Sequence, residues 1–321
     1  MIAKYLALLE TEIRKERFGD QPKSLYEPVR YIMTLGGKRL RPLLTLLSYS
    51  MYKENVAEVV RYAVAVEAFH NFTLLHDDIM DKAPLRRGKP TVHEKWNTNT
   101  AILSGDVMLV KVYEAFQQLE KEKLKQVLSL FNSCAAAVCE GQQWDMTFET
   151  KSKVTEAQYL EMIRLKTAVL LGFSLELGAV LADAPEEDRR ILREVGINLG
   201  IGFQLKDDLL DVYADKNKFG KQVGGDILLN KKTFLLIKAQ EKAKGSDKRD
   251  LQRWLTVGKF DKKKKIAAVS GLYTALGVQA LAEQKILDYF EKGFAGLEKL
   301  SVKGKASGLI RFARDLAARE R

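Results

Sequence analysis

The sequence predicts an all-α fold in which residues 1–321 form a single-domain helical bundle. Apolar residues recur at steps of three and four, as in the segment that ends with Val66 and Phe69, which is the spacing of one helix face. The 321 residues include only 6 prolines, and no Ser/Gly-rich linker or low-complexity block divides them. A single domain is therefore preferred, although the chain is longer than a typical domain.

The expected helices cover most of the chain and are separated by short connections that contain helix breakers. Gly36-Gly37 separates the second helix from the third, Pro84 to Pro90 follows the fourth, and the glycine-containing segment Phe219 to Asp226 follows the eighth. The helices are predicted over residues 2–17, 25–35, 40–52, 56–80, 99–118, 123–148, 155–182, 186–215, 232–244, 247–256, 262–295 and 297–319.

The charge of the chain favours acidic partners without identifying one. The formal net charge is +11, which suits phosphates, nucleic acid or an anionic membrane surface. Much of the excess lies between Lys216 and Lys265. Its last run, Lys262 to Lys265, is interpreted as a solvated turn or helix end, because most charge runs are solvated.

Cysteine usage and hydropathy favour a cytoplasmic location. Cys134 and Cys139 are the only cysteines, and their spacing fits neither a redox pair nor a zinc site. Charged residues interrupt the apolar residues of 1–18, unlike a secretory signal. No run approaches the roughly 20 apolar residues of a membrane span, so none is expected.

Two acidic clusters share one spacing and one sequence context. Each reads Asp-Asp-x-x-Asp at the end of an apolar helix and precedes a basic, glycine-containing loop; they are Asp77, Asp78 and Asp81, and Asp207, Asp208 and Asp211. Residues four apart share a helix face, and two carboxylates about 5 Å apart repel by roughly 3 kcal/mol at an effective dielectric of about 20. Oxygen-only ligands favour Mg²⁺, which commonly shares its coordination with substrate phosphates. Two matched copies argue against a merely solvated acidic helix end.

Basic residues near both clusters are candidate phosphate ligands. In the turn from Gly36 to Pro42, glycines allow an anion to approach the backbone, and Lys38 and Arg41 can reach the same anion. Arg86 and Arg87 follow the first cluster and can direct two guanidinium groups at different phosphates. Further candidates are Lys166, within an otherwise apolar run, and Lys221 and Lys231, after the second cluster.

The histidines do not have the spacing of a zinc site. His70 and His76 are six residues apart, so they lie on different faces of a helix, and His93 is further away. A polar contact from His70 to an anion is the better interpretation, because His70 precedes Asp77 by almost two turns on the same predicted helix.

Together these residues closely resemble the trans-isoprenyl diphosphate synthases, the chain-elongating prenyltransferases. The shared motifs, in order, are Gly36-Gly37-Lys38-Arg39-Leu40-Arg41-Pro42, His76-Asp77-Asp78-Ile79-Met80-Asp81, Arg86-Arg87-Gly88, Lys166-Thr167 and Gly202-Phe203-Gln204-x-x-Asp207-Asp208-x-x-Asp211. The resemblance implies the all-α isoprenoid synthase fold with a deep central cavity, a homodimer, and three Mg²⁺ ions when substrate is bound.

The resemblance also implies a reaction and a role for each motif. Isopentenyl diphosphate would be bound by Lys38, Arg41, His70 and Arg87, and the allylic diphosphate by Arg86, Lys166, Lys221 and Lys231. The principal Mg²⁺ ligands would be Asp77, Asp81 and Asp207, with Asp78, Asp208 and Asp211 ligating directly or through water. Ionisation of the allylic diphosphate would create a carbocation faced by oxygens of Thr167 and Gln204, and isopentenyl diphosphate would add to it.

Two departures from the family pattern matter. Many members read Lys-x-Thr-x-Pro after the second cluster, whereas this chain reads Lys231-Lys232-Thr233-Phe234-Leu235, so the choice between Lys231 and Lys232 stays open. The first cluster also lacks the two-residue insertion found in many bacterial farnesyl diphosphate synthases.

Phe72 and Thr73 are expected to set the product length. A growing chain gains roughly 0.8 kcal/mol per buried CH₂, so it elongates until a bulky side chain blocks it. Phe72 lies five residues before Asp77, further into the apolar part of the helix, and Thr73 beside it is small. A single aromatic residue here resembles short-chain members and favours a C20 product, with C15 next; ordinary core packing of Phe72 is the alternative.

Other functions fit less well. A longer-chain polyprenyl synthase remains an alternative, whereas a terpene cyclase or head-to-head prenyl synthase would need no isopentenyl site, against Lys38, Arg41 and Arg87. A phosphohydrolase built on His76-Asp77 would need further histidine ligands. A basic helical protein that binds nucleic acid or membranes would explain the charge of +11 but neither acidic cluster.

Overall fold

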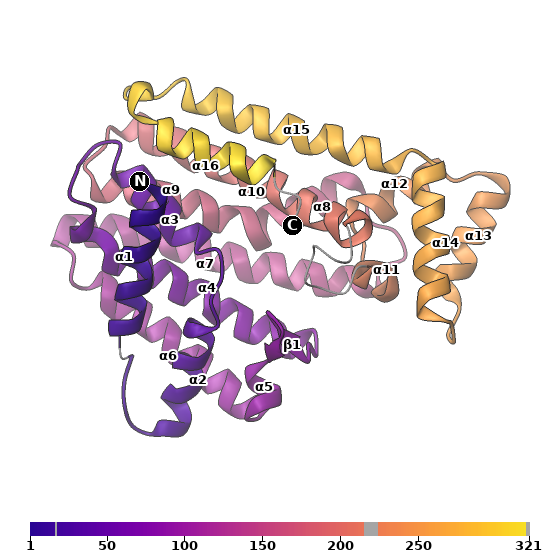
Figure 1. The fold of residues 1–321 in the computed structure, drawn as a ribbon, viewed down its shortest axis with the longest axis horizontal. Coiled ribbons are helices and arrows are strands. Elements are labelled where there is room, and N and C mark those ends of the chain that lie inside the picture. Colours follow the sequence, from indigo (N-terminus) through magenta and orange to yellow (C-terminus); the bar gives the residue numbers. More distant parts are fainter. Residues whose placement is uncertain (17, 215–223, 319–321) are drawn as a thin grey trace. The chain divides into compact units, whose positions relative to one another are not determined.

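The computed structural model describes residues 1–16, 18–214 and 224–318. It is 79% helical with 1% strand, which confirms the all-α prediction (Figure 1). The elements are α1 (Ile2–Lys15), α2 (Lys23–Thr34), α3 (Leu40–Tyr49), η1 (Val56–Val59), α4 (Val60–Met80), β1 (Leu85–Arg86), β2 (Lys89–Pro90), α5 (Val92–Lys95), α6 (Thr98–Phe116), α7 (Lys121–Thr150), α8 (Glu156–Ile163), η2 (Arg164–Ala168), α9 (Val169–Leu181), α10 (Glu186–Tyr213), α11 (Gly225–Leu229), α12 (Phe234–Lys242), α13 (Gly245–Thr256), α14 (Lys262–Ala275), α15 (Val278–Leu297), η3 (Lys303–Lys305) and α16 (Ser307–Ala317).

Side-chain caps explain several helix boundaries. The side chain of Asn97 accepts a hydrogen bond from the backbone N–H of Thr100 at 2.8 Å and so begins α6. Thr155 and Gln158 form a reciprocal capping box at the start of α8. Asp261 accepts from the backbone N–H of Lys264 at 2.9 Å and begins α14. Each cap satisfies amide donors that have no partner within the helix.

The described residues divide into two compact units, and unit 1 contains the first acidic cluster. Unit 1 comprises residues 1–134, 170–194 and 296–312. Its centre is α4, which packs on α6 and α3 and buries nearly every residue from Val60 to Phe69. A helix that is apolar on all sides is stable only inside a core, so α4 is the buried element that carries the cluster at its end.

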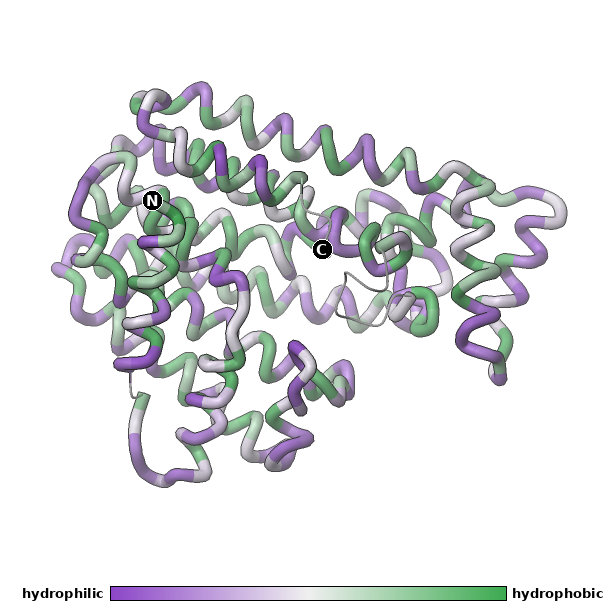
Figure 2. Tube along the Cα trace, in the orientation of Figure 1, coloured by the Kyte–Doolittle hydropathy of each residue, from purple (hydrophilic) through white to green (hydrophobic). Residues whose placement is uncertain are grey.

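Unit 2 contains the second acidic cluster and comprises residues 135–169, 195–295 and 313–321. Within it α14 packs on α11, α12 and α13, and α8 packs on α12 (Figure 1). Hydrophobic and hydrophilic residues alternate along α15 in Figure 2, in keeping with its alternation of buried residues such as Ala282 and Ile286 with exposed ones. The carboxyl-terminal part of α10 and the π-helical turn η2 both belong to unit 2.

Several predicted helices differ from the observed ones. The prediction of one helix over 262–295 is wrong, because Gly277 adopts a φ of +66° and separates α14 from α15. The helix predicted over 297–319 is replaced by η3 and the shorter α16. The helix predicted over 155–182 contains the π-helical turn η2, and the one over 56–80 begins as the 3₁₀ turn η1. The β1–β2 hairpin, α5 and α11 were not predicted.

Within the described part of the chain, no single helix has both the length and the apolar character needed to cross a membrane. Helices α14 and α15 meet those criteria only when taken together, and they are bent by 71° at the break between them.

Candidate functional site

The first acidic cluster lies at the carboxyl end of α4. Asp78 is 2% exposed, Asp77 is half-buried, and Asp81, the C-cap residue, is exposed. The N–H of Asp81 donates to the carbonyl of Asp77 at 2.8 Å, which keeps the two residues on adjacent turns as the spacing predicted. A helix carries partial negative charge at its carboxyl end, so three carboxylates gathered there favour a cation.

The β1–β2 hairpin brings Arg86 to this cluster. Arg86 pairs with Lys89, and the two turn residues between them have positive φ, 53° at Arg87 and 74° at Gly88. Arg86 donates from Nε and Nη2 to the two carboxylate oxygens of Asp78 at 2.8 and 2.6 Å. Burial raises the pKa of Asp78, and the guanidinium opposes that rise. Asp78 and Arg86 thus form a bidentate ion pair, which was not predicted from the sequence.

The loop before α3 places Gly37 against the other arginine of the hairpin. Gly37 has a φ of +137°, and a Cβ atom there would lie 2.6 Å from the Nη1 and Nη2 atoms of Arg87. Only glycine combines this backbone conformation with so close an approach of the guanidinium. The predicted anion ligands Lys38 and Arg87 are both exposed, and they belong to segments that meet at Gly37.

Arg39 anchors the same loop from inside unit 1, a role that sequence reasoning missed. It is 2% exposed and has left-handed backbone with a φ of 47°. Its guanidinium donates to Oε1 of Glu10 at 2.7 Å, to Oε1 of Glu67 at 2.8 Å and to the carbonyl of Met33 at 2.7 Å. A buried guanidinium with three acceptors holds the backbone between Lys38 and Arg41 firmly against α1 and α4.

His70 contacts Arg41, as neighbouring ligands of one anion would. The Nη1 atom of Arg41 lies 3.0 Å from Nε2 of His70. Burial, followed by the charges of Arg41, Arg86, Arg87 and Arg39, lowers the pKa of His70 well below its ordinary value, so the ring is neutral. Because a guanidinium only donates hydrogen bonds, Nε2 is the acceptor and the ring proton resides on Nδ1.

Phe72 and Thr73 lie where α4 packs on α6. The half-buried ring of Phe72 is 5.7 Å from the ring of Phe69 and 4.8 Å from that of His76, measured between centroids. His76 in turn packs against Gly105 of α6, where a Cβ atom would lie 2.5 Å from Nε2. The hydroxyl of Thr73 donates to the carbonyl of His70 at 2.8 Å. Phe72 is therefore held in a defined position one turn and a half before Asp77.

The second acidic cluster lies near the carboxyl end of α10 in unit 2. Asp208 is 7% exposed, whereas Asp207 and Asp211 are half-buried. Tyr159 donates to Oδ2 of Asp208 at 2.5 Å, and Nε2 of Gln204 donates to Oδ1 at 2.9 Å. Burial raises the pKa of Asp208 to about 7, although both donors act in the opposite direction.

Asp226, which was not among the predicted site residues, joins this cluster. Its backbone N–H donates to Oδ2 of Asp211 at 3.0 Å, and the N–H of Gly224 donates to the carbonyl of Asp211. Burial, followed by the charges of Asp208 and Asp211, raises the pKa of Asp226 well above its ordinary value. Such a shift marks a crowded group of carboxylates.

Lys166 and Thr167 lie on the π-helical turn η2. Lys166 donates from Nζ to Oδ2 of Asp145 at 2.6 Å, and the buried hydroxyl of Thr167 donates to Oε1 of Gln204 at 3.1 Å. Two glycines pack against this turn: a Cβ at Gly141 would lie 2.2 Å from the backbone N of Lys166, and one at Gly200 would lie 2.6 Å from Cα of Ala168.

The lysines after the second cluster differ in environment. Lys221 lies outside the described residues. Lys231 is near enough to Asp208 and Asp226 to lower the pKa of both, whereas Lys232 donates to the carbonyl of Asn230 at 3.4 Å.

The interpretation of Lys262 to Lys265 as a solvated run is wrong for its last residue. Lys265 is 1% exposed, and its Nζ donates to Oδ1 of Asn230 at 2.7 Å. Lys265 therefore holds Asn230, the residue immediately before Lys231, in place.

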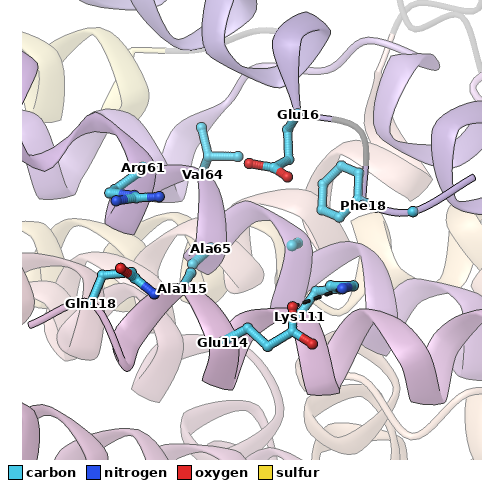
Figure 3. A pocket seen from close by; sticks show the side chains of 11 residues that line it. Glu16, Phe18, Arg61, Val64, Ala65, Lys111, Glu114, Ala115 and Gln118 are labelled. Atoms are coloured by element: carbon cyan, nitrogen blue, oxygen red, sulfur yellow. Dashed lines mark hydrogen bonds and ion pairs between the residues drawn. The ribbon is translucent and has the colours of Figure 1, made fainter.

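A pocket of about 360 Å³ in unit 1 is separate from these residues (Figure 3). It is lined by Glu16, Arg61, Lys111 and Glu114 around an apolar floor, and Lys111 is paired with Glu114 at 2.7 Å. None of the predicted site residues lines it. Among the described residues, no three His, Cys, Asp or Glu side chains form a ready-made metal site.

Comparison with known proteins gives consistent matches over most of the chain. The family model described as Polyprenyl synthetase matches residues 22–272. The chain is 33% identical over 321 residues to a short chain isoprenyl diphosphate synthase of Methanothermobacter thermautotrophicus, covering 100% of this chain and 98% of that protein. It is 43% identical over 224 residues to a geranylgeranyl diphosphate synthase of Methanosarcina mazei, covering 69% of each. A crystal structure of a geranylgeranyl pyrophosphate synthase superposes with a TM-score of 0.95 at 41% identity, covering 100% of this chain and 99% of that one.

Proposed function

The chain belongs to the polyprenyl synthetase family, and from that premise we propose that it condenses isopentenyl diphosphate with an allylic diphosphate to give a C15–C20 prenyl diphosphate, with C20 favoured. The enzyme class is that of a prenyltransferase. The observation that carries the proposal is that each acidic cluster lies at or near the carboxyl end of a helix and has basic side chains of its own unit close by. This is the arrangement expected where carboxylates and cations share a diphosphate.

In unit 1, Lys38, Arg41 and Arg87 bind the diphosphate of isopentenyl diphosphate. Two contacts support this: Gly37 packs against the Arg87 guanidinium, and Arg41 is held by the neutral ring of His70 at 3.0 Å. His70 then acts by orienting Arg41 and by donating from Nδ1. Arg86, which holds Asp78 at 2.6 Å, can extend its remaining guanidinium hydrogens to the allylic diphosphate.

Mg²⁺ is the proposed cofactor, and the donor set fits it. All six residues of the two clusters are aspartates, and hard divalent cations prefer carboxylate oxygens. Asp77, Asp81 and Asp207 are the principal ligands, with Asp78, Asp208 and Asp211 acting directly or through water. Bound Mg²⁺ stabilises the negative charge that develops on the leaving diphosphate.

In unit 2, Lys166, Lys221 and Lys231 hold the allylic diphosphate, while Thr167 and Gln204 present oxygens to the allylic cation. The hydrogen bond from Thr167 to Gln204 at 3.1 Å supports a joint role for these two residues. Lys231 is preferred over Lys232, because Lys231 acts electrostatically on Asp208 and Asp226 and Lys232 contacts its own loop. The apolar surroundings exclude water that would quench the cation.

Product length is assigned to Phe72, with the small Thr73 beside it. The contacts of Phe72 with Phe69 and His76 support a fixed ring at this depth of α4. Similarity to proteins named for geranylgeranyl diphosphate supports C20 over C15.

A homodimer and a cytoplasmic location complete the proposal. Helix α6 exposes Leu103 at 58% and Val110 at 53%, and residues seven apart share a helix face. A second copy of the chain is the proposed cover for this apolar face. Two free thiols, Cys134 and Cys139, suit a reducing compartment. Sedimentation at micromolar concentration should give the mass of a dimer, and a monomer would contradict this part.

Elongation by the purified protein tests the proposal. Labelled isopentenyl diphosphate is supplied with dimethylallyl, geranyl or farnesyl diphosphate, with Mg²⁺ or with a chelator. We expect Mg²⁺-dependent incorporation with at least one primer. Absence of incorporation with every primer would refute the proposed function.

A further inference from the structure

Tyr159 and Asp208 form a buried contact that none of the proposed substrate interactions requires. Tyr159 is 1% exposed, is presented by the capped helix α8, and donates to Oδ2 of Asp208 at 2.5 Å. Burial, followed by the charge of Asp208, raises the pKa of Tyr159 well above its ordinary value, so its hydroxyl remains a donor. One oxygen of Asp208 is thus engaged by the protein itself.

The other oxygen of Asp208 determines which way the Gln204 amide points. Tyr159 and Gln204 both donate to Asp208, so the NH₂ group of Gln204 faces Oδ1 of Asp208, at 2.9 Å. The carbonyl oxygen of Gln204 is then turned the opposite way, where the hydroxyl of Thr167 donates to it at 3.1 Å. Asp208 therefore determines the orientation of the Gln204 side-chain amide, with its NH₂ group toward Asp208 and its carbonyl oxygen toward Thr167.

The backbone that carries Thr167 is equally constrained. Thr167 lies in a π-helical turn, which adds a residue to the helical turn and redirects the side chains around it. Gly141 and Gly200 allow α7 and α10 to approach that turn to within van der Waals contact. Hydrogen bonds connect Tyr159 to Thr167 through Asp208 and Gln204. Tyr159 on α8 and Thr167 on η2 are also close in sequence, because the two elements are consecutive.

We infer that Tyr159 and Asp208 are positioning residues, which orient Gln204 so that its carbonyl oxygen and the Thr167 oxygen are presented to the allylic cation. The inference rests on the proposed function. It assigns Tyr159 a part in turnover. It also gives Asp208 the role of orienting Gln204, and because Tyr159 and Gln204 engage both of its oxygens, its contribution to Mg²⁺ binding is through water. A carbonyl dipole aimed beforehand at a developing charge needs no reorganisation during reaction.

Tyr159→Phe removes the hydroxyl with little change of volume, and Tyr213→Phe is its control. Tyr213 lies on α10 of the same unit, and its hydroxyl reaches Thr274 at 3.5 Å instead of an aspartate. Tyr159→Phe should lower kcat by about tenfold, with KM for both substrates within about twofold of wild type. Tyr213→Phe should leave kcat unchanged.

A double-mutant cycle shows whether Tyr159 acts through Gln204. Gln204→Met removes the amide, so adding Tyr159→Phe to it should produce no further loss of kcat. Fully additive losses would overturn the inference, because they would mean that Tyr159 acts independently of Gln204. An unchanged kcat in Tyr159→Phe would overturn it as well.

The affinity for Mg²⁺ with inorganic diphosphate, measured by calorimetry, provides a readout besides turnover. Asp208→Asn should keep this affinity within about twofold while kcat falls, whereas the matched variant Asp207→Asn, at a proposed Mg²⁺ ligand, should lose it. Equal losses of affinity in both variants would overturn the positioning role, and this comparison decides the matter even if Tyr159→Phe fails to fold. A wild-type protein without elongation activity would overturn the proposed function and this inference together.

Discussion

Arg86 donates from Nε and Nη2 to the two oxygens of Asp78, at 2.8 and 2.6 Å, and so links the β1–β2 hairpin to the end of α4. Arg86→Met would leave a carboxylate that is 2% exposed without its cation. Breaking a buried pair from one side costs about 3 kcal/mol, so urea unfolding should show a loss of that order. Lys89→Met, in the same hairpin but exposed, should change stability by less than about 0.5 kcal/mol.

The loss in Arg86→Met should depend on pH in a defined direction. Burial raises the pKa of Asp78 in the folded protein, and removal of the guanidinium raises it further. A carboxyl whose folded pKa is raised binds more protons when folded, so stability falls as pH rises above about 4. The difference between variant and wild type should therefore grow from pH 4 towards pH 7, and a constant difference would contradict the buried pairing.

His70 should make the wild-type protein less stable in mild acid. Its folded pKa is lowered by burial and by the charges of Arg41, Arg86, Arg87 and Arg39, so below about pH 6.5 the unfolded chain binds the additional proton. Stability should fall by up to about 1.4 kcal/mol for each pH unit below that point. His70→Gln should reduce this slope between pH 7 and 5. Equal slopes in wild type and His70→Gln would exclude a buried neutral ring.

Gly37→Ala should weaken binding of isopentenyl diphosphate more than binding of the allylic substrate. The added methyl group would lie 2.6 Å from the Arg87 guanidinium and displace it. Gly36→Ala is the matched control, because Gly36 also has positive φ, +82°, but a Cβ there meets nothing within 4 Å. KM for isopentenyl diphosphate should rise about tenfold in Gly37→Ala relative to Gly36→Ala, equivalent to about 1.4 kcal/mol. Similar values in both variants would remove Arg87 from the proposed subsite.

Phe72→Ala should lengthen the product. Removing the ring opens space beside Phe69 and His76, and each further buried CH₂ stabilises a longer chain by about 0.8 kcal/mol. Chromatography of the dephosphorylated products should show chains beyond C20. Phe294→Ala, at another half-buried phenylalanine that packs on Phe290, should leave the product unchanged. An unaltered profile in Phe72→Ala would mean that Phe72 is ordinary core.

Helical periodicity was sufficient to predict the fold class and most helices, because apolar spacing reports directly on one buried face. The break at Gly277 was missed, since a glycine within an otherwise helical pattern is often tolerated. The π-helical turn at Lys166 and Thr167 could not be predicted, because it depends on close packing of Gly141 and Gly200 from distant segments. The hairpin had only a weak signal, in Gly88, because Arg87 also adopts positive φ and arginine does not favour that conformation.

The candidate site was predictable to the level of residue types and no further. Repeated aspartate spacing and nearby cations identified the two clusters, because like charges at helical spacing require a partner. The pairing of Asp78 with Arg86 and of Asp208 with Tyr159 depends on tertiary contacts that spacing does not encode. Lys265 was misinterpreted for the same reason, since its burial against Asn230 is created by the packing of α14 on α11.

A single condensation with farnesyl diphosphate tests the central claim most directly. The purified protein, excess farnesyl diphosphate, labelled isopentenyl diphosphate and Mg²⁺ are combined, and the labelled product is sized after removal of the diphosphate. The proposal predicts a labelled C20 alcohol that forms with Mg²⁺ and is absent with a chelator. If label enters no prenyl product with farnesyl or any shorter allylic diphosphate, the assignment of both acidic clusters to diphosphate chemistry is contradicted.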